Sequence, residues 1–387
     1  MPVKRHYFDW AASAPCETPR LCAPFGNPSS LHSEGRAAKQ SLEDARGHCA
    51  VALNVPPEKL FFTSGGTESN SIALFSVLTR KSSGRIISSL TEHSSVREGM
   101  ASIEKMGKPV GRIAVDSSGR VNAQTLTKAL AQYSDARFIS VMSVNNETGA
   151  VTDIPSLRDV IRNQSAGNAP VHFHCDLVQA IGKIPVNIMD WDIDSASISA
   201  HKIGGPRGIG LLYLRRPLEI FYSGGGQEKG IRGGTENTGG AAGLACCLEK
   251  YSLSKTKEQI TNDSDEQYAR AKTRWKRLIS GLCGMKRCVL IPAERAECED
   301  QFSPYILQAA FSYVPGEVMA RALDDLGFAV STGSACSSSS PQRPVLLAMG
   351  VSEKLQMEGI RISQGWSTTE EEIDLLLEAI TEVLKFL

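Results

Sequence analysis

The sequence predicts an α/β protein whose mostly parallel central sheet is covered by helices, and three observations support this fold class. Short apolar or β-branched runs alternate with helical stretches through the middle of the chain. Polar residues follow the end of each predicted strand, which is where parallel sheets bind ligands. From about residue 250 the sequence becomes charged and helical, which indicates a second, smaller domain. A chain of 387 residues is long enough for both.

Five short runs carry the strand prediction. They are "KLFFTS", "GRIISS", "RFISVMSV", "PVHFHCD" and "SASISA", and they alternate with helical stretches such as "TESNSIALFSVLTR" and "IPSLRDVIRN". This alternation is typical of βαβ units. We expect a large domain at residues 15–249 and a small α+β domain made of residues 1–14 and 250–387. The small domain ends in the amphipathic stretch "TTEEEIDLLLEAITEVLKFL", which begins with a capping box.

Composition and charge argue against several classes of partner. The 42 lysines and arginines balance 42 aspartates and glutamates, so no net charge attracts nucleic acid or an anionic membrane. No apolar run approaches the roughly 20 residues that cross a bilayer. The first residues lack the apolar segment of a signal peptide, so we expect a cytoplasmic protein whose ten cysteines are reduced thiols.

Two strand ends carry groups that suit an anionic cofactor. "TSGGTESN" places glycines and hydroxyl groups at the start of a predicted helix, where backbone amides can bind one phosphate. The same pattern also fits a capped helix after a tight turn. "SASISAHKIGGPRG" places Lys202 at a strand end between Ser199, His201 and flexible glycines. A partly desolvated lysine in such a position is a candidate nucleophile.

The stretch "VHFHCDLVQA" has two interpretations. His172, His174 and Asp176 lie on one face of a predicted strand, so they could bind a metal ion as in some hydrolases. Asp176 could instead pair with a protonated ring nitrogen. A lysine that forms Schiff bases, an aspartate for a pyridine nitrogen and a phosphate site at a helix start together indicate pyridoxal 5'-phosphate.

Near the end of the chain, "STGSACSSSS" at residues 331–340 contains one thiol, Cys336, among small residues. Composition alone predicts a disordered serine linker in which this thiol is incidental.

A series of motifs resembles the cysteine desulfurases of the NifS/IscS type. In chain order the motifs are "FDWAASAP", "FGNPSS", "FTSGGTESN", "TEH", "VNNETG", "DLVQ", "SAHKIGGPRGIG", "GGGQEKGIRGGTEN", "STGSAC" and "IRIS". The family consists of class V pyridoxal-phosphate enzymes of fold type I. They move sulfur from L-cysteine onto their own cysteine and leave L-alanine. The resemblance extends from residue 7 to near the end of the chain.

The resemblance implies a cofactor role for each matching residue. It assigns Lys202 to the covalent bond with the cofactor and Asp176 to the ring nitrogen. It assigns Gln179 and Asn146 to the ring oxygen, and it stacks His93 on the ring as a candidate acid or base. Thr67, Ser199 and His201 would hold the phosphate, together with Thr235 from a second subunit. The resemblance therefore implies a homodimer.

The resemblance also assigns the substrate and the sulfur. Arg361 would bind the carboxylate of L-cysteine in bidentate fashion, with help from Asn27. Cys336 would take the sulfur as a persulfide and pass it to an acceptor protein, such as an Fe-S scaffold, a tRNA-thiolation protein or a carrier. His172 would then be structural, and the metal interpretation would no longer apply.

Two departures and three alternatives accompany this interpretation. "CETPRLCAP" stands where family members usually carry a helix, and its Cys16 and Cys22 are either incidental surface thiols or a redox or metal contact. The segment after Cys336 is about one residue shorter than usual. The alternatives are a selenocysteine lyase or other class V lyase, a metal-dependent hydrolase that uses His172, His174 and Asp176, and a catalytically idle Fe-S scaffold.

Overall fold

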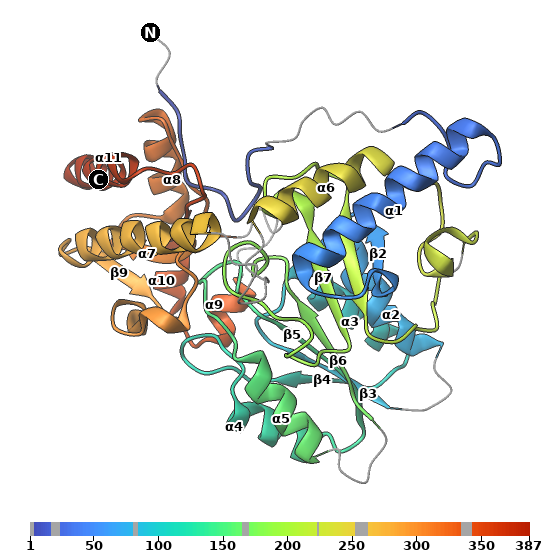
Figure 1. Ribbon diagram of the computed structural model, residues 1–387. Coiled ribbons are helices and arrows are strands. Elements are labelled where there is room, and N and C mark those ends of the chain that lie inside the picture. The colour runs from blue at the N-terminus through green and yellow to red at the C-terminus, as the bar shows by residue number, and fades with distance from the viewer. Residues whose placement is uncertain are drawn as a thin grey trace.

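The computed structural model describes residues 4–16, 24–79, 84–164, 170–222, 224–251, 262–333 and 343–387. Within these ranges the chain forms a seven-stranded sheet, a three-stranded sheet and a two-stranded sheet (Figure 1). The large sheet is mostly parallel and has helices on both faces, which confirms the predicted α/β class. None of the helices in these ranges is long and apolar enough to cross a membrane.

The large sheet has the strand order β2-β8-β7-β6-β5-β3-β4. Among its described strands only β8 runs against the others, since it pairs antiparallel with both β2 and β7. Each of the five predicted runs forms a strand, whereas β4 and β8 lie where we predicted none. The strands are β2 (Leu60–Thr63), β3 (Arg85–Ser89), β4 (Val110–Ile113), β5 (Ala136–Met142), β6 (His172–Asp176), β7 (Ser195–Ser199) and β8 (Gly210–Leu214).

The two faces of this sheet are covered by different helices. Alternation along β5 illustrates the division, because Ile139 contributes to one apolar cluster and Phe138 to the other. The first cluster contains buried residues of α1 (Ser33–Leu53), α4 (Ala123–Gln132), α5 (Ile154–Gln164) and α6 (Thr238–Tyr251). The second contains buried residues of α2 (Gly66–Phe75) and α3 (Ser94–Lys105).

The C-terminal part of the chain builds a second core that also includes an N-terminal strand. Its antiparallel sheet has the order β12-β10-β9, and β1 pairs in parallel with β11. Phe8 is buried in this core, and its carbonyl oxygen accepts a hydrogen bond from Ser363 N at 2.8 Å. The division at residues 14 and 249 stays a prediction. The strands are β1 (His6–Tyr7), β9 (Cys288–Ile291), β10 (Ile306–Phe311), β11 (Phe328–Ala329) and β12 (Gly359–Ser363).

The second core is covered by α7, α8 and α11, whose buried residues pack with its strands. The last helix begins at the predicted capping box, in which Thr369 and Glu372 each accept a hydrogen bond from the other's backbone N–H. The bounds are α7 (Asn262–Cys283), α8 (Gly316–Asp325), α9 (Pro344–Ala348), α10 (Glu353–Glu358) and α11 (Glu370–Phe386).

A buried ion pair connects α1 to the strand that leads into the predicted phosphate site. Arg46 donates to both carboxylate oxygens of Glu228, at 2.8 and 2.9 Å. Glu228 also accepts from Phe62 N on β2 at 2.8 Å. The side chains of Arg46 and Glu228 are only 7% and 1% exposed, so neither charge has water as an alternative partner.

Replacing Glu228 by glutamine should lower the free energy of unfolding by about 3–5 kcal/mol, because the Arg46 guanidinium then stays buried without its full counter-charge. Urea unfolding measures this change. The matched control is Arg270→Ala, which removes an exposed ion pair with Glu266 and should cost less than about 1 kcal/mol. Equal effects of the two substitutions would contradict the expected importance of burial.

Candidate active site

The carboxyl ends of β5, β6 and β7 lie beside a cavity of about 280 Å³. One of its lining residues comes from β12 of the small sheet, so the cavity lies between the two sheets. Most of the residues that we predicted for the site line it. They are Thr67, His93, Asn146, Asp176, Gln179, Ser199, His201, Lys202 and Arg361.

The turn between β2 and α2 forms one wall of the cavity. Gly65 has φ of +150°, a conformation that strains any residue with a side chain. A Cβ on Gly66 would lie 2.6 Å from Val178 Cγ2, so this position also excludes a side chain. Gly66 and Thr67 begin α2, and the first N–H groups of a helix have no partner within the helix. This wall can therefore bind a phosphate.

Lys202 ends a 3₁₀ turn, η3 (Ala200–Lys202), that follows β7 directly. Its Nζ donates to the carbonyl oxygen of Ala11 at 2.6 Å and to that of Ala12 at 2.8 Å. Both acceptors belong to the main chain of the N-terminal segment, which side-chain motifs do not reveal. The amine is thus oriented at the cavity wall by backbone groups.

Asp176 ends β6, and its side chain is held by two donors. Oδ1 accepts from Val178 N at 2.9 Å, and Oδ2 accepts from Asn70 Nδ2 at 2.8 Å. Asp176 is 4% exposed and Asn70 only 1%, so water cannot replace these bonds. Sequence reasoning missed Asn70, although it belongs to the quoted motif "TSGGTESN".

His93 caps α3 at the edge of the cavity. Ser95 N donates to His93 Nδ1 at 3.2 Å, so a neutral ring carries its proton on Nε2. Burial lowers the pKa of His93 below its ordinary value of 6.5, whereas the charge of Asp176 acts in the opposite direction. The net lowering favours a neutral imidazole that can accept or relay a proton near pH 7.

Gln179 is oriented by a lysine that sequence reasoning missed. Lys183 Nζ donates to Gln179 Oε1 at 2.5 Å, and Gln179 Nε2 donates to the Ala11 carbonyl at 2.9 Å. Burial lowers the pKa of Lys183 well below its ordinary value, with the charge of Lys202 as the next cause.

Arg361 reaches the cavity from β12. Its Nη1 donates to the carbonyl oxygens of Asn146 at 3.0 Å and Gly333 at 2.8 Å, and its Nη2 lies 2.7 Å from Asp9 Oδ1. The side chain is 3% exposed. Within the described residues, Arg361 Nε has no hydrogen-bond partner. A carboxylate in the cavity can bind to the guanidinium of Arg361, where it would compete with the carboxylate of Asp9.

Two of the predicted residues do not line the cavity, and a third lies outside the described residues. Thr235 and Asn27 are exposed in this chain, and Asn27 Oδ1 accepts from Ser29 N. Their assigned contacts with phosphate and substrate stay predictions. Cys336 lies outside the described residues, as does Cys22.

The remaining thiol of the shortened segment, Cys16, is exposed. The two interpretations of Cys16 given above stay predictions.

The two histidines of "HFHCD" bind a hydroxyl group in this structure. His172 Nε2 and His174 Nδ1 lie 2.8 and 2.7 Å from Ser195 Oγ, while His174 Nε2 contacts Asn70. Across the described ranges no three His, Cys, Asp or Glu side chains converge in a way that could hold a metal ion. The geometry therefore gives no support to the metal-dependent hydrolase.

Comparison with known proteins gives the family. A family model described as aminotransferase class-V matches residues 18–376. The chain belongs to the aminotransferase class-V family. This agrees with the resemblance inferred from its motifs, and enzymes of this family use pyridoxal phosphate.

Individual relatives narrow the comparison within the class V family. "Cysteine desulfurase IscS" of Shewanella sediminis is 35% identical over 395 residues, covering 97% of this chain and 92% of that protein. A solved structure named "NIFS-LIKE PROTEIN" has a TM-score of 0.86 and 32% identity, and the match covers 99% of this chain and 100% of that one. A third, "SspA in complex with cysteine", has a TM-score of 0.75 and 29% identity, with 92% and 98% covered.

A second buried carboxyl group, that of Glu92, lines the cavity together with Asp176. Glu92 Oε1 accepts from Met142 N at 2.8 Å, and Glu92 is 1% exposed. Burial, followed by the charge of Asp176, raises the pKa of Glu92 from 4.5 to about 8. The folded chain therefore holds a proton that the unfolded chain releases between these two pH values.

The cofactor-free chain should lose stability from this group as the pH rises from 4.5 to about 8. Glu92→Gln has no proton to lose. The free energy of unfolding of this variant, relative to that of the parent, should therefore rise by about 3–4 kcal/mol between pH 5 and pH 8. Urea unfolding at both pH values measures the difference. A difference that does not vary with pH would contradict the raised pKa.

Proposed function

We propose that this chain is a pyridoxal-phosphate-dependent cysteine desulfurase, which converts L-cysteine to L-alanine and carries the sulfur on Cys336 as a persulfide. The observation that carries the proposal is one cavity that brings together Lys202, Asp176 and Arg361 from separate elements. An amine, a carboxylate for a ring nitrogen and a guanidinium for a carboxylate are the groups that amino-acid chemistry on this cofactor needs. The names of the relatives support the same activity.

The residues present fit pyridoxal phosphate. The start of α2, with Ser199 and His201 nearby in the cavity lining, offers donors for its phosphate. Asp176 would hold the ring nitrogen and Lys202 would bind the aldehyde carbon. Asn146 Oδ1 is buried without a partner among the described residues, which leaves an unsatisfied polar atom at the position assigned to the ring oxygen. The bound cofactor would supply an acceptor for the electrons released at the substrate's Cα.

The chain's own residues then perform the remaining steps. Arg361 binds the substrate carboxylate and so orients the Cα–H bond. Lys202 would hold the cofactor and, when its amine is free, would take the Cα proton at Nζ. Asp176 keeps the ring nitrogen protonated throughout. His93, neutral near pH 7, can hold or relay a proton at Nε2.

Sulfur transfer completes the proposed reaction. The Cys336 thiolate attacks the substrate sulfur, so an S–S bond forms as the C–S bond breaks. The C–S electron pair returns to the substrate carbon, which takes up a proton and leaves as alanine. Cys336 is then a persulfide, which a thiol of an acceptor protein can accept. The acceptor is proposed to be an Fe-S scaffold, a tRNA-thiolation protein or a carrier.

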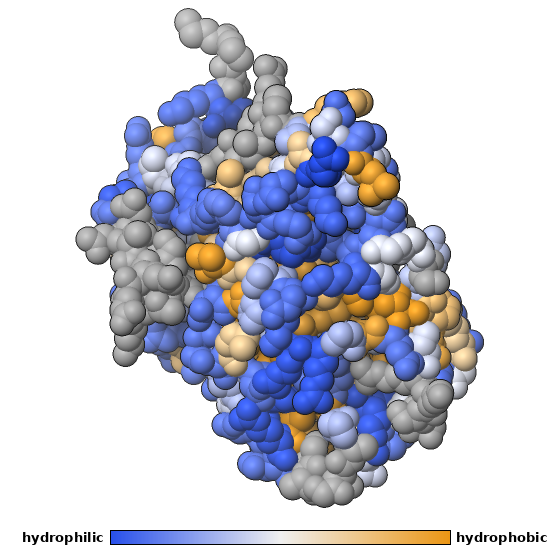
Figure 2. Space-filling view, turned by 45° about the vertical axis from the view of Figure 1, so that its right-hand side comes forward, coloured by the Kyte–Doolittle hydropathy of each residue, from blue (hydrophilic) through white to orange (hydrophobic). Residues whose placement is uncertain are grey.

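We also propose that two copies of the chain form the working enzyme. Figure 2 shows a mostly hydrophilic face that is crossed by a band of hydrophobic residues. Large apolar side chains are exposed in the single chain, including Phe25 at 90%, Leu31 at 91% and Phe221 at 53%. Contact with a second copy would cover such residues. It would also allow Thr235, which is exposed here, to reach a neighbouring site.

Incubation with L-cysteine tests the proposed function. We expect alanine in solution and one added sulfur on the peptide that contains Cys336, both detected by mass spectrometry. Borohydride treatment of the loaded enzyme should attach the cofactor's mass to the peptide that contains Lys202. Cys336→Ser should keep the cofactor and lose the transferred sulfur, whereas Cys283→Ser, at an exposed thiol, should behave like the parent. Full sulfide release by Cys336→Ser would favour a selenocysteine lyase or another class V lyase.

Replacing Arg361 by lysine tests the carboxylate contact. A lysine cannot form the bidentate bond, so KM for L-cysteine should rise roughly 10- to 100-fold while kcat changes less. Steady-state kinetics measure both constants. Arg287→Lys is the control, because Arg287 donates to main-chain carbonyls of the small sheet region and should leave KM unchanged. An unchanged KM for Arg361→Lys would remove this residue from the substrate site.

A further inference from the structure

A continuous chain of hydrogen bonds runs through the interior of the large domain and ends at Asp176. His172 Nε2 contacts Ser195 Oγ at 2.8 Å, and Ser195 Oγ contacts His174 Nδ1 at 2.7 Å. His174 Nε2 contacts Asn70 Oδ1 at 2.9 Å, and Asn70 Nδ2 donates to Asp176 Oδ2 at 2.8 Å. Asn70, His174 and Ser195 are at most 1% exposed.

The charge of Asp176, at one end of this hydrogen-bond chain, determines which atom carries each proton along it. An ionised Asp176 only accepts, so Asn70 presents its NH₂ group to the carboxylate and its oxygen to His174. His174 must then donate from Nε2. Burial lowers the pKa of His174 to about 3, so the ring is neutral and its Nδ1 carries no proton. The Ser195 hydroxyl therefore donates to Nδ1 and accepts from His172.

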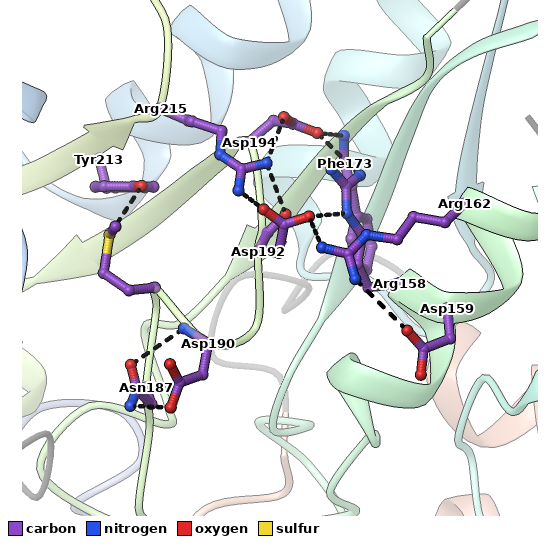
Figure 3. A network of polar contacts seen from close by, with 11 residues as sticks. Arg158, Asp159, Arg162, Phe173, Asn187, Asp190, Asp192, Asp194, Tyr213 and Arg215 are labelled. Carbon is purple, nitrogen blue, oxygen red and sulfur yellow. Dashed lines mark hydrogen bonds and ion pairs between the residues drawn. The ribbon is translucent and has the colours of Figure 1, made fainter.

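Contacts at the amino-terminal ends of β6 and β7, away from the cavity, hold the hydrogen-bond chain in place. Asp194 precedes Ser195, and its Oδ2 accepts from Phe173 N at 2.9 Å, while Phe173 O accepts from Asp194 N at 2.8 Å. Arg158 of α5 contacts Asp194 at 3.2 Å and Asp192 at 2.9 Å, as Figure 3 shows. These bonds fix the register of β6 against β7.

In that register His174 lies directly opposite Ser195. A shift of one residue would turn the side chains of one strand to the other face of the sheet and break the chain.

We propose that His174 and Ser195 are positioning residues that keep the Asn70 amide turned so that Asp176 stays ionised and oriented toward a pyridine nitrogen. The inference rests on the proposed function, because it gives these hydrogen bonds a role in holding pyridoxal phosphate. Without the Ser195 hydroxyl, the His174 proton can move to Nδ1. The bare Nε2 then faces Asn70, whose amide turns its oxygen toward Asp176. Two oxygens in contact disfavour the charged carboxylate.

Three variants test this inference. Ser195→Ala removes the donor to His174, and Asn70→Asp places a second carboxyl group beside Asp176. Ser197→Ala is the matched control, because it removes a buried hydroxyl from the same face of β7. Ser197 Oγ lies 3.5 Å from His174 Nε2, a nitrogen that already donates to Asn70. Thermal unfolding of the cofactor-free chains checks that each variant folds.

Two quantities are measured for the parent and for each of the three variants. The first is the dissociation constant of pyridoxal phosphate from titration of the cofactor-free protein. The second is the ¹⁵N chemical shift of the ring nitrogen in bound, labelled cofactor, which reports whether that nitrogen is protonated. We expect Ser195→Ala and Asn70→Asp to weaken binding about tenfold or more and to move the shift toward unprotonated pyridine. Ser197→Ala should match the parent in both measurements.

The outcomes separate this inference from the function on which it rests. If the parent binds the cofactor and both Ser195→Ala and Asn70→Asp keep its affinity and its ¹⁵N shift, the positioning role is overturned and the function stands. Weaker binding with an unchanged ¹⁵N shift also overturns it, because a structural defect alone would have that effect. Failure of the parent to bind pyridoxal phosphate overturns the proposed function and this inference together.

Discussion

The parallel pairing of β6 with β7 sets the geometry on which the rest of the site depends. β6 ends at Asp176, and β7 ends at Ser199, three positions before Lys202. Because the two strands are hydrogen-bonded neighbours with Asp176 opposite Ser197, the carboxylate and the lysine turn leave the sheet at the same edge. The cavity forms at that edge because the carboxyl ends of parallel strands diverge into separate loops there.

A short N-terminal segment joins this edge to the second core. Phe8 packs in the core around the small sheet, and Asp9 pairs with Arg361. Slightly further along the same segment, the carbonyl oxygens of Ala11 and Ala12 accept hydrogen bonds from the amine of Lys202. The same few residues therefore contact groups of both sheets. Movement of this segment would change the orientation of the lysine and the availability of the guanidinium together.

Sequence reasoning found the groups that follow a strand directly and missed those that act through a partner. Lys202 and Asp176 were predictable because each lies at the end of an apolar run. Asn70 was not singled out, because its role comes from a bond to Asp176 across 106 positions of sequence. The carbonyl of Ala11 carries no side-chain signal at all. The strand β8 was missed because its apolar run follows the turn after Lys202 without an intervening helix, and the prediction relied on strands that alternate with helices.

Burial explains why so many ionisable groups in the cavity wall and directly behind it are compatible with a stable fold. It lowers the pKa of His174 to about 3 and that of Lys183 well below its ordinary value, and it raises the pKa of Glu92 to about 8. Each of these groups is thereby shifted toward its neutral form, in which hydrogen bonds alone can satisfy it.

Two other groups of the cavity have a counter-charge or several hydrogen-bond donors close by. Arg361 has Asp9, and Asp176 has the amides of Asn70 and Val178. A zwitterionic amino acid that enters the cavity would bring a carboxylate for Arg361. Bound pyridoxal phosphate would bring a cationic ring nitrogen for Asp176. The substrate and cofactor thus replace or complete existing pairs, so that binding leaves no new charge buried without a partner.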